Sequence, residues 1–553
     1  MKKNLTAIVA AAVSAALLLS ACGGSSTTPE SVAPGNASES SDAEKVLNVQ
    51  RGPSPETIDP ALNSASDGAN MILHAFEGLL KFDQNNDIVG GLAESWEQSE
   101  DGLTWTFHLR PDLKWSDGSA LTANDFVYSW KRVADPNTAA PYGYDLLNVV
   151  AGYEEASKGD IDALQVEATD DNTFVVHLSN PCVYFDKIAA FTVMVPVQQA
   201  TIEAAGDSWA TDPATYITDG PYYMTEFTDG SQIVFEKNPY YWDAENITFD
   251  KIVWHLIEDS NTSYTAYNQG ELDMIKDVPT EEIPTLNGNE EFHVEPLMGT
   301  YYVTFNTQKE PFNDAKVREA LSLAIDRKYV ADTIMQGTYS PATNFVGAGV
   351  SDAAEGSSFV DVTKEKYGDH FDIENYDANL EKAKELLAEA GYPNGEGFPA
   401  FDYLTNDSGY HKAVAEYLQS AWAELGLTMN VNIQEWKTVT ADRRAGNFDV
   451  ARNGWVYDWD DPSNMINLLE TTNGNNDGKY SSAEFDKLVD EARSTTDIDK
   501  HYDLLHQAEQ VLLNDAAMAP IAYYNEFWLQ KPNLKGTWHS PYGYWYFMYG
   551  SFE

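Results

Sequence analysis

The sequence predicts an α/β protein made of several structural units, in which mixed β-sheets carry helices on their faces. Its 553 residues are too many for one hydrophobic core, so about three units are expected. Segments that alternate apolar and polar residues, as half-buried strands do, lie between stretches of helical periodicity. One predicted helix leads through a glycine straight into a predicted strand, which is an α/β connection.

The individual elements follow from these periods. Strands are expected where apolar residues recur at every second position, over 105–109, 252–256 and 427–433. A helix is expected with Asp377 as its N-cap, closed by Gly391 and Pro393. A second helix carries an apolar stripe from Val414 to Leu425 and is expected to end at Gly426.

Composition excludes several classes of protein. Lys and Arg number 34 against 87 Asp and Glu, a formal net charge of −53, so nucleic acid is not expected as a partner. With 43% hydrophobic and 12% aromatic residues, the chain is not of the disordered class. Two cysteines, Cys22 and Cys182, cannot build a disulfide framework or a cysteine-rich metal site.

The N-terminus has the pattern of a secretory signal. Two lysines precede an apolar run, and the small residues Ser20 and Ala21 stand directly before Cys22. This ending resembles the bacterial lipobox, which implies a signal peptide over 1–21 and lipidation of Cys22. The alternative is an ordinary signal peptide with a chance cysteine. Residues 22–45 continue as a Ser-, Gly- and Pro-rich flexible linker, and no later segment is long and apolar enough to span a membrane.

Motifs of catalysis and metal binding are not found. The sequence has no HExxH, GxSxG or GxxxxGK[ST] motif. Cys182 lies in an apolar setting and is expected to be a buried, inert thiol. Residues 473–484 nearly fit an EF-hand calcium loop, but the first ligand is Asn473 rather than Asp, which favours an ordinary polar loop. No metal and no cofactor are therefore expected.

A resemblance to a known family extends over nearly the whole body of the chain. Its motifs, in order, are Ala93-Glu-Ser-Trp96, Lys114-Trp-Ser-Asp-Gly118, Thr122-Ala-Asn-Asp-Phe-Val-Tyr-Ser-Trp130, Asp135-Pro-Asn-Thr-Ala-Ala-Pro-Tyr142, Pro311-Phe-Asn-Asp314, Gln434-Glu-Trp-Lys-Thr438 and Phe448-Asp-Val-Ala-Arg-Asn-Gly-Trp455. They resemble solute-binding protein family 5, the peptide-binding lipoproteins of ABC importers, and within it the oligopeptide-binding branch.

The resemblance implies a two-lobed, periplasmic-binding-protein-like fold (type II, cluster C) with an extra inserted domain. Domains I and III would be α/β lobes joined by two crossing strands, and they would enclose the ligand by hinge closure. The implied boundaries are 46–81, 197–298 and 527–553 for domain I, 82–196 for domain II and 299–526 for domain III.

The implied function is a receptor without enzymatic activity that captures oligopeptides and delivers them to the permease of an ABC transporter. It would be a monomer, lipid-anchored at the extracytoplasmic face of the cell membrane, on the outer surface of a Gram-positive cell. One alternative is the same fold with another solute, such as a dipeptide, a nickel chelate, haem or an oligosaccharide. The second is an extracellular peptidase.

The resemblance also implies site residues. Asp458, three residues after Trp455, matches the aspartate that binds the peptide's α-ammonium, with an exposed loop acid as the alternative. Asp460 and Asp461 are expected to be exposed loop acids, Asp461 also as a helix N-cap before Pro462. Arg443 and His411 match positions for the carboxylate end, with a surface arginine as the alternative for Arg443. The remaining matches are Arg452 under the pocket and the aromatic residues Trp436 and Tyr142, for which core packing is the alternative.

Two segments match the family's strand-like edges for the peptide backbone. They are Ser64-Ala65-Ser66, where the family has a glutamate, and Gly454-Trp455-Val456-Tyr457, where Val456 and Tyr457 replace smaller residues. The first side-chain pocket is therefore expected to differ in size from that of the relatives. The excess of acidic residues adds a hypothesis of its own, that an acidic cleft entrance favours cationic peptides.

Overall fold

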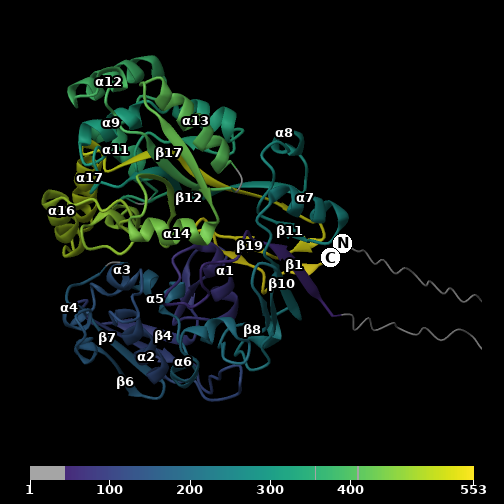
Figure 1. The fold of residues 1–553 in the computed structure, drawn as a ribbon. Helices are drawn as coiled ribbons and strands as arrows, with labels where there is room; N and C mark the ends of the chain where they lie inside the picture. The colour runs from purple at the N-terminus through teal and green to yellow at the C-terminus, as the bar shows by residue number, and fades with distance from the viewer. Residues whose placement is uncertain (1–43, 183, 355, 408–409) are drawn as a thin grey trace, which may run out of the picture. The chain divides into compact units, whose positions relative to one another are not determined.

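The computed structural model describes residues 44–182, 184–354, 356–407 and 410–553. The predicted signal peptide, the lipidation site at Cys22 and nearly all of the predicted linker lie outside the described residues. In the described part of the chain, no helix combines the length and the apolar character that crossing a membrane requires. Residues 44–553 form one unit, which Figure 1 shows.

A large mixed sheet runs through this unit. Its strands, in spatial order, are β15 (Met429–Gln434), β14 (Phe401–Asn406), β16 (Val450–Val456), β12 (Phe292–Phe305), β17 (Met518–Gln530), β11 (Met274–Ile275), β1 (Val46–Gln50), β10 (Lys251–His255), β9 (Gln232–Lys237) and β8 (Tyr222–Thr228), with β13 (Ser340–Pro341) paired to β17. β14 pairs in parallel with β15 and β16, whereas β12 pairs antiparallel with β16 and β17. The predicted mixed sheet and the strands predicted near 252 and 427 are thereby confirmed.

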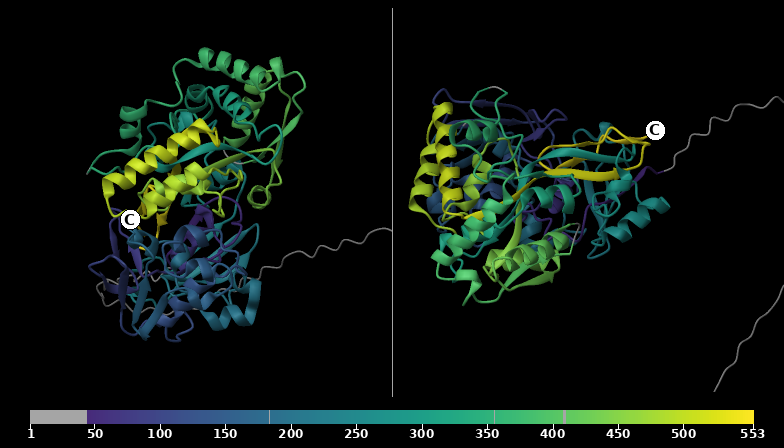
Figure 2. Two further views of the ribbon diagram at one scale, coloured as in Figure 1. Left: turned by 90° about the vertical axis from the view of Figure 1, so that its left-hand side faces the viewer. Right: turned by 90° about the horizontal axis from the view of Figure 1, so that it is seen from above.

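The strands β12 and β17 connect the two halves of the sheet. Both are long, and they pair from Phe292 with Leu529 to Thr304 with Met518, with a register shift between Pro296 and Thr300. One end of this pair adjoins β16 and the other adjoins β11, so the pair runs from one half of the molecule into the other (Figures 1 and 2). This is the arrangement expected of two crossing strands.

A smaller antiparallel sheet lies inside the range predicted for domain II. It contains β4 (Ala93–Gln98), β5 (Thr104–Leu109), β7 (Thr173–His177) and β6 (Val166–Asp170), in that order. β5 alternates half-buried and buried residues, which confirms the strand predicted over 105–109. The helix α2 (Ala123–Ala134) packs on this sheet, and a capping box in which Thr122 N donates to Asp125 Oδ2 at 2.7 Å fixes where it begins.

Helices surround the half of the large sheet that contains β14, β15 and β16. They are α9 (Ala315–Leu323), α11 (Phe359–Tyr367), α12 (Tyr376–Glu389), α13 (His411–Ala423), α16 (Ala483–Arg493) and α17 (Ile498–Asn514). α12 and α13 confirm the two predicted helices, and Gly391 and Gly426 both have positive φ, as helix ends favour. The predicted N-cap is wrong by two positions: Asn375 is the N-cap of α12, and Asp377 lies in its first turn.

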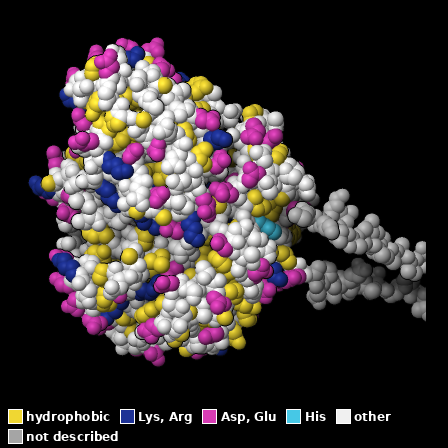
Figure 3. Space-filling model, viewed as in Figure 1, with side chains coloured by type: hydrophobic (Ala, Val, Ile, Leu, Met, Phe, Trp, Pro, Cys, Tyr) yellow, Lys and Arg dark blue, Asp and Glu magenta, His cyan; other side chains and the backbone are white. Residues whose placement is uncertain are grey.

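The interior and the surface agree with the composition. Cys182 is 4% exposed, and burial raises the pKa of its thiol to about 12, as expected of an unreactive cysteine. Figure 3 shows Asp and Glu side chains spread over the visible face with Lys and Arg side chains among them. On this face the acidic residues therefore form a dispersed, solvated surface.

Candidate ligand-binding site

One cavity collects nearly all of the predicted site residues. Its wall is formed by β16, β12, β17, the segment before α1 (Ser66–Ala75), the start of α13, and α14 (Trp436–Ala445). The predicted residues that line it are Ser64, Ala65, Ser66, Tyr142, His411, Trp436, Arg443, Arg452, Gly454, Trp455, Val456 and Asp458. Residues that lie far apart in the sequence thus meet at one site.

Asp458 is a buried carboxylate in the wall of this cavity. Its relative exposure is 6%, so the alternative of an exposed loop acid is wrong. Tyr142 Oη donates to its two carboxylate oxygens at 3.3 and 3.1 Å, and Asn464 Nδ2 donates to Oδ2 at 3.1 Å. Burial raises the pKa of Asp458 to about 7, and no cation among the described residues opposes this. Such a carboxylate is an acceptor for a ligand ammonium.

Tyr142 and Trp455 frame this carboxylate. The Tyr142 ring lies 5.7 Å from the Trp455 ring and 5.0 Å from the Phe191 ring. Trp455 Nε1 donates to Asn464 Oδ1 at 3.0 Å, the same oxygen that accepts the backbone N–H of Asp458. The aromatic residues therefore hold the acid in one orientation at the cavity wall.

Arg443 extends from α14 to the opposite part of the cavity. Its Nη1 donates to the Arg452 carbonyl at 3.0 Å and to Asn453 Oδ1 at 2.8 Å, and its Nε lies 3.4 Å from Asp477 Oδ2. Its side chain is 11% exposed, so the alternative of a surface arginine is wrong. Burial lowers the pKa of this guanidinium, and the charge of Asp477 opposes this effect. An arginine side chain is a cation at neutral pH.

Arg452 and Trp436 complete a cationic end of the cavity. The Arg452 guanidinium lies 5.0 Å from the Trp436 ring centre and 5.6 Å from that of Tyr301, and Arg443 lies 5.5 Å from the Trp436 ring. Trp436 is half-buried and lines the cavity rather than packing inside the core. Two guanidinium groups face one nearby acid, Asp477, so this end can accept a ligand carboxylate.

His411 stands at the same end as a neutral group. It is the first residue of α13, and its ring stacks on Tyr301 at a centroid distance of 5.6 Å. Burial, and then the charges of Arg452, Lys276 and Arg443, hold the pKa of His411 well below its usual value. The imidazole can therefore give a hydrogen bond to a ligand but no positive charge.

The matching backbone segments lie on two sides of the cavity. Among the described strands, β14 pairs with β16 only at Val450 and Ala451, so the later residues of β16 present one edge without a strand partner. Part of this edge is engaged by side chains, because the Gly454 N–H donates to Asn453 Oδ1 at 2.9 Å. Opposite, Ser64 accepts a hydrogen bond from Arg444 Nη2. A Cβ at Gly454 would lie 2.0 Å from Tyr524 Oη, which explains the glycine.

Tyr457 does not line the cavity, and its side chain is 0% exposed and belongs to the hydrophobic core, so its predicted contact through the backbone stays a prediction. Two predictions about neighbouring residues are wrong. Asp461 is 2% exposed and pairs with His501 Nε2 at 3.1 Å. It also accepts the N–H of Ser463 at 2.9 Å, although Pro462 is the residue at the N-cap of the short helix α15 (Ser463–Ile466). Asp460 accepts from Ser351 N at 2.8 Å and is not a free surface acid.

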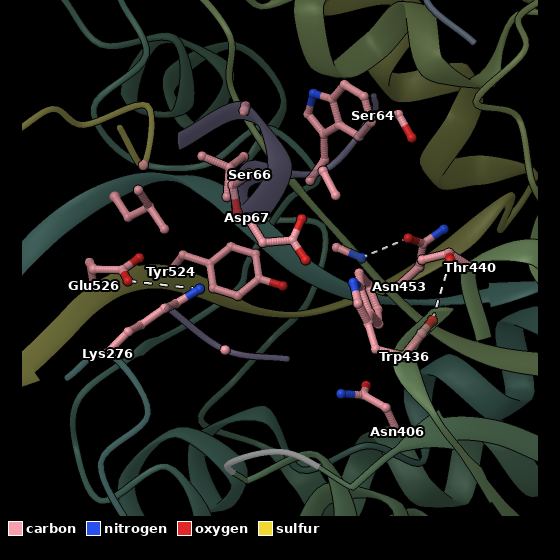
Figure 4. Close-up of a pocket in the computed structure, with 18 of the residues that line it drawn as sticks. Ser64, Ser66, Asp67, Lys276, Asn406, Trp436, Thr440, Asn453, Tyr524 and Glu526 are labelled. Carbon is pink, nitrogen blue, oxygen red and sulfur yellow. Dashed lines mark hydrogen bonds and ion pairs between the residues drawn. The ribbon is translucent and has the colours of Figure 1, made fainter. Parts of the chain in front are cut away.

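Several cavity residues were not predicted from the sequence. Asp67, Lys276 and Glu526 gather near Tyr524 at one end, as Figure 4 shows. Asp67 follows Ser66 directly, so the matched segment itself pointed to it. Lys276 directly follows β11 and Glu526 lies on β17, and the sequence carries no signal that would bring them together.

The loop with the near-calcium pattern has other contacts. Asn473 and Asn475 donate through their amide nitrogens to Asp145, and Asp477 pairs with Arg443. In the described part of the chain, no group of three or more His, Cys, Asp or Glu side chains is placed to hold a metal ion.

The fold and the cavity together define a two-lobed solute-binding protein of type II with a further domain inserted. A model of the bacterial extracellular solute-binding proteins, family 5, matches residues 87–477, and the chain belongs to this family. It is 37% identical over 488 residues to the periplasmic oligopeptide-binding protein OppA of Salmonella typhimurium, with 87% of each chain covered. Haemophilus influenzae OppA in complex with RPPGFSPFR is 32% identical with a TM-score of 0.83, covering 92% of this chain and 99% of that one.

Two structures of one relative differ in how well they match. The murein tripeptide-binding protein MppA of Escherichia coli is 31% identical and superposes with a TM-score of 0.83, covering 91% of this chain and 98% of that one. MppA in its unliganded open form is also 31% identical and covers 91% and 97%, but its TM-score is 0.60. The lobes of this chain are therefore not arranged as in the open form.

Proposed function

We propose that this protein captures oligopeptides outside the cytoplasm, encloses them between its lobes and delivers them to the permease of an ABC transporter. The observation that carries the proposal is that Asp458 and the two arginines Arg443 and Arg452 line the same cavity. A peptide has a terminal ammonium and a terminal carboxylate, and the two ends of the cavity offer an acceptor and two donors for them. The oligopeptide-binding relatives support the same assignment.

Peptide binding to Asp458→Asn tests the proposal. The substitution keeps the shape of the side chain but removes its charge, so a buried ligand ammonium would lose its partner. We expect the affinity for tri-alanine to fall by roughly 100-fold or more, measured by calorimetry, with an unchanged melting temperature as control. N-acetylated tri-alanine should bind the variant and the natural protein about equally poorly. Unchanged affinity in Asp458→Asn would contradict the peptide assignment.

The alternatives have distinct outcomes. Mass spectrometry of ligand extracted from the purified protein would identify a dipeptide, nickel chelate, haem or oligosaccharide if the fold serves another solute. Incubation with peptides would release fragments if the protein were a peptidase. We propose no covalent chemistry, since the cavity residues are arranged as ion-pair and hydrogen-bond partners.

The location is part of the proposal. We infer a monomer with the lipid attached at Cys22, held at the extracytoplasmic face of a Gram-positive membrane, with the domain boundaries given above. Metabolic labelling with a palmitate analogue should mark the protein, and Cys22→Ser should remove the label and release the protein into the medium. Label on the Cys22→Ser variant would contradict the anchor.

A further inference from the structure

A cluster of charged side chains lies at the end of the cavity near Tyr524 (Figure 4). Arg51 Nη1 and Lys276 Nζ lie 3.4 and 3.9 Å from the same oxygen of Glu526. Asp277 also lines this end and accepts from Gln50 Nε2 at 2.8 Å. With Asp67, the cluster holds one carboxylate more than it holds cations.

Two carboxylates of this cluster, Asp67 and Asp277, form no ion pair with a lysine or arginine among the described residues. Asp277 accepts from the Gln50 side chain, whereas Asp67 has the adjacent Gly68 N–H at 2.7 Å and a weaker hydrogen bond from the Trp436 side chain. Figure 4 shows its carboxylate pointing into the cavity between Tyr524 and Trp436. Burial raises the pKa of Asp67, and the hydrogen bond from Gly68, the charges of Lys276 and Arg51, and the hydrogen bond from Trp436 reduce this effect without cancelling it. A further cation at this point would stabilise the ionised form.

The charges elsewhere in the cavity do not compensate for Asp67. Arg443 faces Asp477, and Arg444 forms an ion pair with Glu56 at 3.1 Å, which leaves Arg452 as the unmatched cation. Asp458 is the unmatched acid at its own end. A peptide with neutral side chains supplies one ammonium for Asp458 and one carboxylate for Arg452. Such a ligand leaves Asp67 uncompensated inside a closed cavity, which is costly.

We infer that Asp67 is a specificity-determining residue that selects peptides carrying a lysine or arginine side chain. This inference rests on the proposed function and deepens it. The side-chain ammonium or guanidinium would donate charge-assisted hydrogen bonds to Asp67, while its aliphatic part lies against Tyr524 and Trp436. A carboxylate in the first turn of α1 is also favoured by the helix dipole, but that effect does not require the side chain to face the cavity.

Matched peptides test the inference. Lysine or norleucine is placed in turn at each position of tri-alanine, because the two side chains have similar length and differ in charge. In the natural protein we expect lysine to be preferred at one position by at least about tenfold. In Asp67→Asn that preference should disappear, with the norleucine peptides bound within about threefold of their original affinity. Glu435→Gln, which removes an exposed charge outside the cavity lining, should keep the preference.

Three outcomes would overturn the inference. These are equal binding of lysine and norleucine peptides at every position, a lysine preference that persists in Asp67→Asn, and a smaller effect of N-acetylation in Asp67→Asn. The last result would mean that Asp67 holds the α-ammonium rather than a side chain. If the natural protein bound none of the peptides, the proposed function itself would fail, which is a separate result from the loss of lysine preference.

Discussion

Burial gives single side chains of the cavity protonation states that differ from those of the same residues in water. The pKa of Asp458 is raised to about 7 because its carboxylate has neutral donors and no cation around it. The pKa of His411 is lowered because it shares a buried space with arginines. At neutral pH the ammonium acceptor is thus only partly ionised in the empty cavity.

The affinity for tri-alanine should therefore depend on pH. An ammonium binds the ionised Asp458, so a proton must leave this group at pH values below its pKa of about 7. Affinity should fall as pH decreases through 7, approaching about tenfold per pH unit in the acid range. Calorimetry in buffers of different ionisation enthalpy would detect the released proton. A flat profile would contradict the prediction, and an equal slope in Asp458→Asn would assign the dependence to another group.

The role of a residue was predictable from the sequence where the residue belongs to a motif. It was not predictable where the role depends on a partner far away in the sequence. Asp458, Arg443 and Trp436 were found through their place in matched motifs, and all three line the cavity. Asp461 was taken for a surface acid because its partner, His501, lies 40 residues further along the chain. Burial of an acid depends on what packs over it, and a single sequence does not show this.

At the scale of elements, hydrogen bonds join the loop over 470–477 to Tyr144 and Asp145, which lie in the range predicted for domain II. Asn473 and Asn475 donate to Asp145, and Tyr144 donates to Glu470 Oε1 at 3.3 Å. Glu470 is held in turn by Arg493 Nη2 at 2.6 Å. Burial, with the nearby charge of Glu470, raises the pKa of Asp145 to about 8. We infer that the loop with the near-calcium pattern acts as a clasp between the segments predicted to be domains II and III.

Removing the clasp should shorten the time that a peptide stays bound. In Asp145→Ala the amides of Asn473 and Asn475 lose their acceptor, so the closed arrangement loses stability. We expect peptide dissociation to be about tenfold faster with little change in association, followed by stopped-flow tryptophan fluorescence. Asp162→Ala is the matched control, because Asp162 pairs with Lys131 on the same small domain. Equal rates in both variants would show that the clasp does not hold the lobes.

The crossing strands should tolerate no side chain at Gly299. A Cβ there would lie 2.4 Å from the Trp455 carbonyl and 2.9 Å from Tyr524, so β16 would have to move. We expect Gly299→Ala to lower the free energy of unfolding by roughly 1–3 kcal/mol and to weaken peptide binding as well. Urea titration with and without tri-alanine would measure both effects. A variant of unchanged stability would mean that the strands adjust freely.

Element types followed from the sequence more reliably than their connections. Alternation located β5, β10 and β15, and glycines marked the ends of α12 and α13. The pairing of β1 with β10, whose residues lie about 200 positions apart in the register, has no local signal. Such long-range pairing is set by packing, and the family resemblance implied only that 46–81 and 197–298 belong to one domain.

For the whole molecule, the net charge of −53 acts at longer range than any single contact. The acidic side chains in Figure 3 are dispersed, so their effect on a ligand is a summed field. Association of a lysine-containing peptide should slow as salt rises from about 0.01 to 0.5 M, and that of a neutral peptide should not. Stopped-flow rates would separate the two. If the association rates of the two peptides depended on salt in the same way, the net charge of the protein would have a role in solubility alone.

The C-terminal segment has a consequence for the order in which the chain folds. The Trp545 N–H donates to Asn70 Oδ1 at 2.8 Å, and the Phe547 N–H lies 3.2 Å from His74 Nε2. Asn70 and His74 are 0% exposed in the complete fold, so these polar groups exchange water for protein partners only when the last residues of the chain have packed. Deletion of 527–553 should thus leave a chain sensitive to protease from its N-terminal part onward, as limited proteolysis would show. We infer that α1 gains its full set of buried contacts only after the C-terminal segment has packed on it.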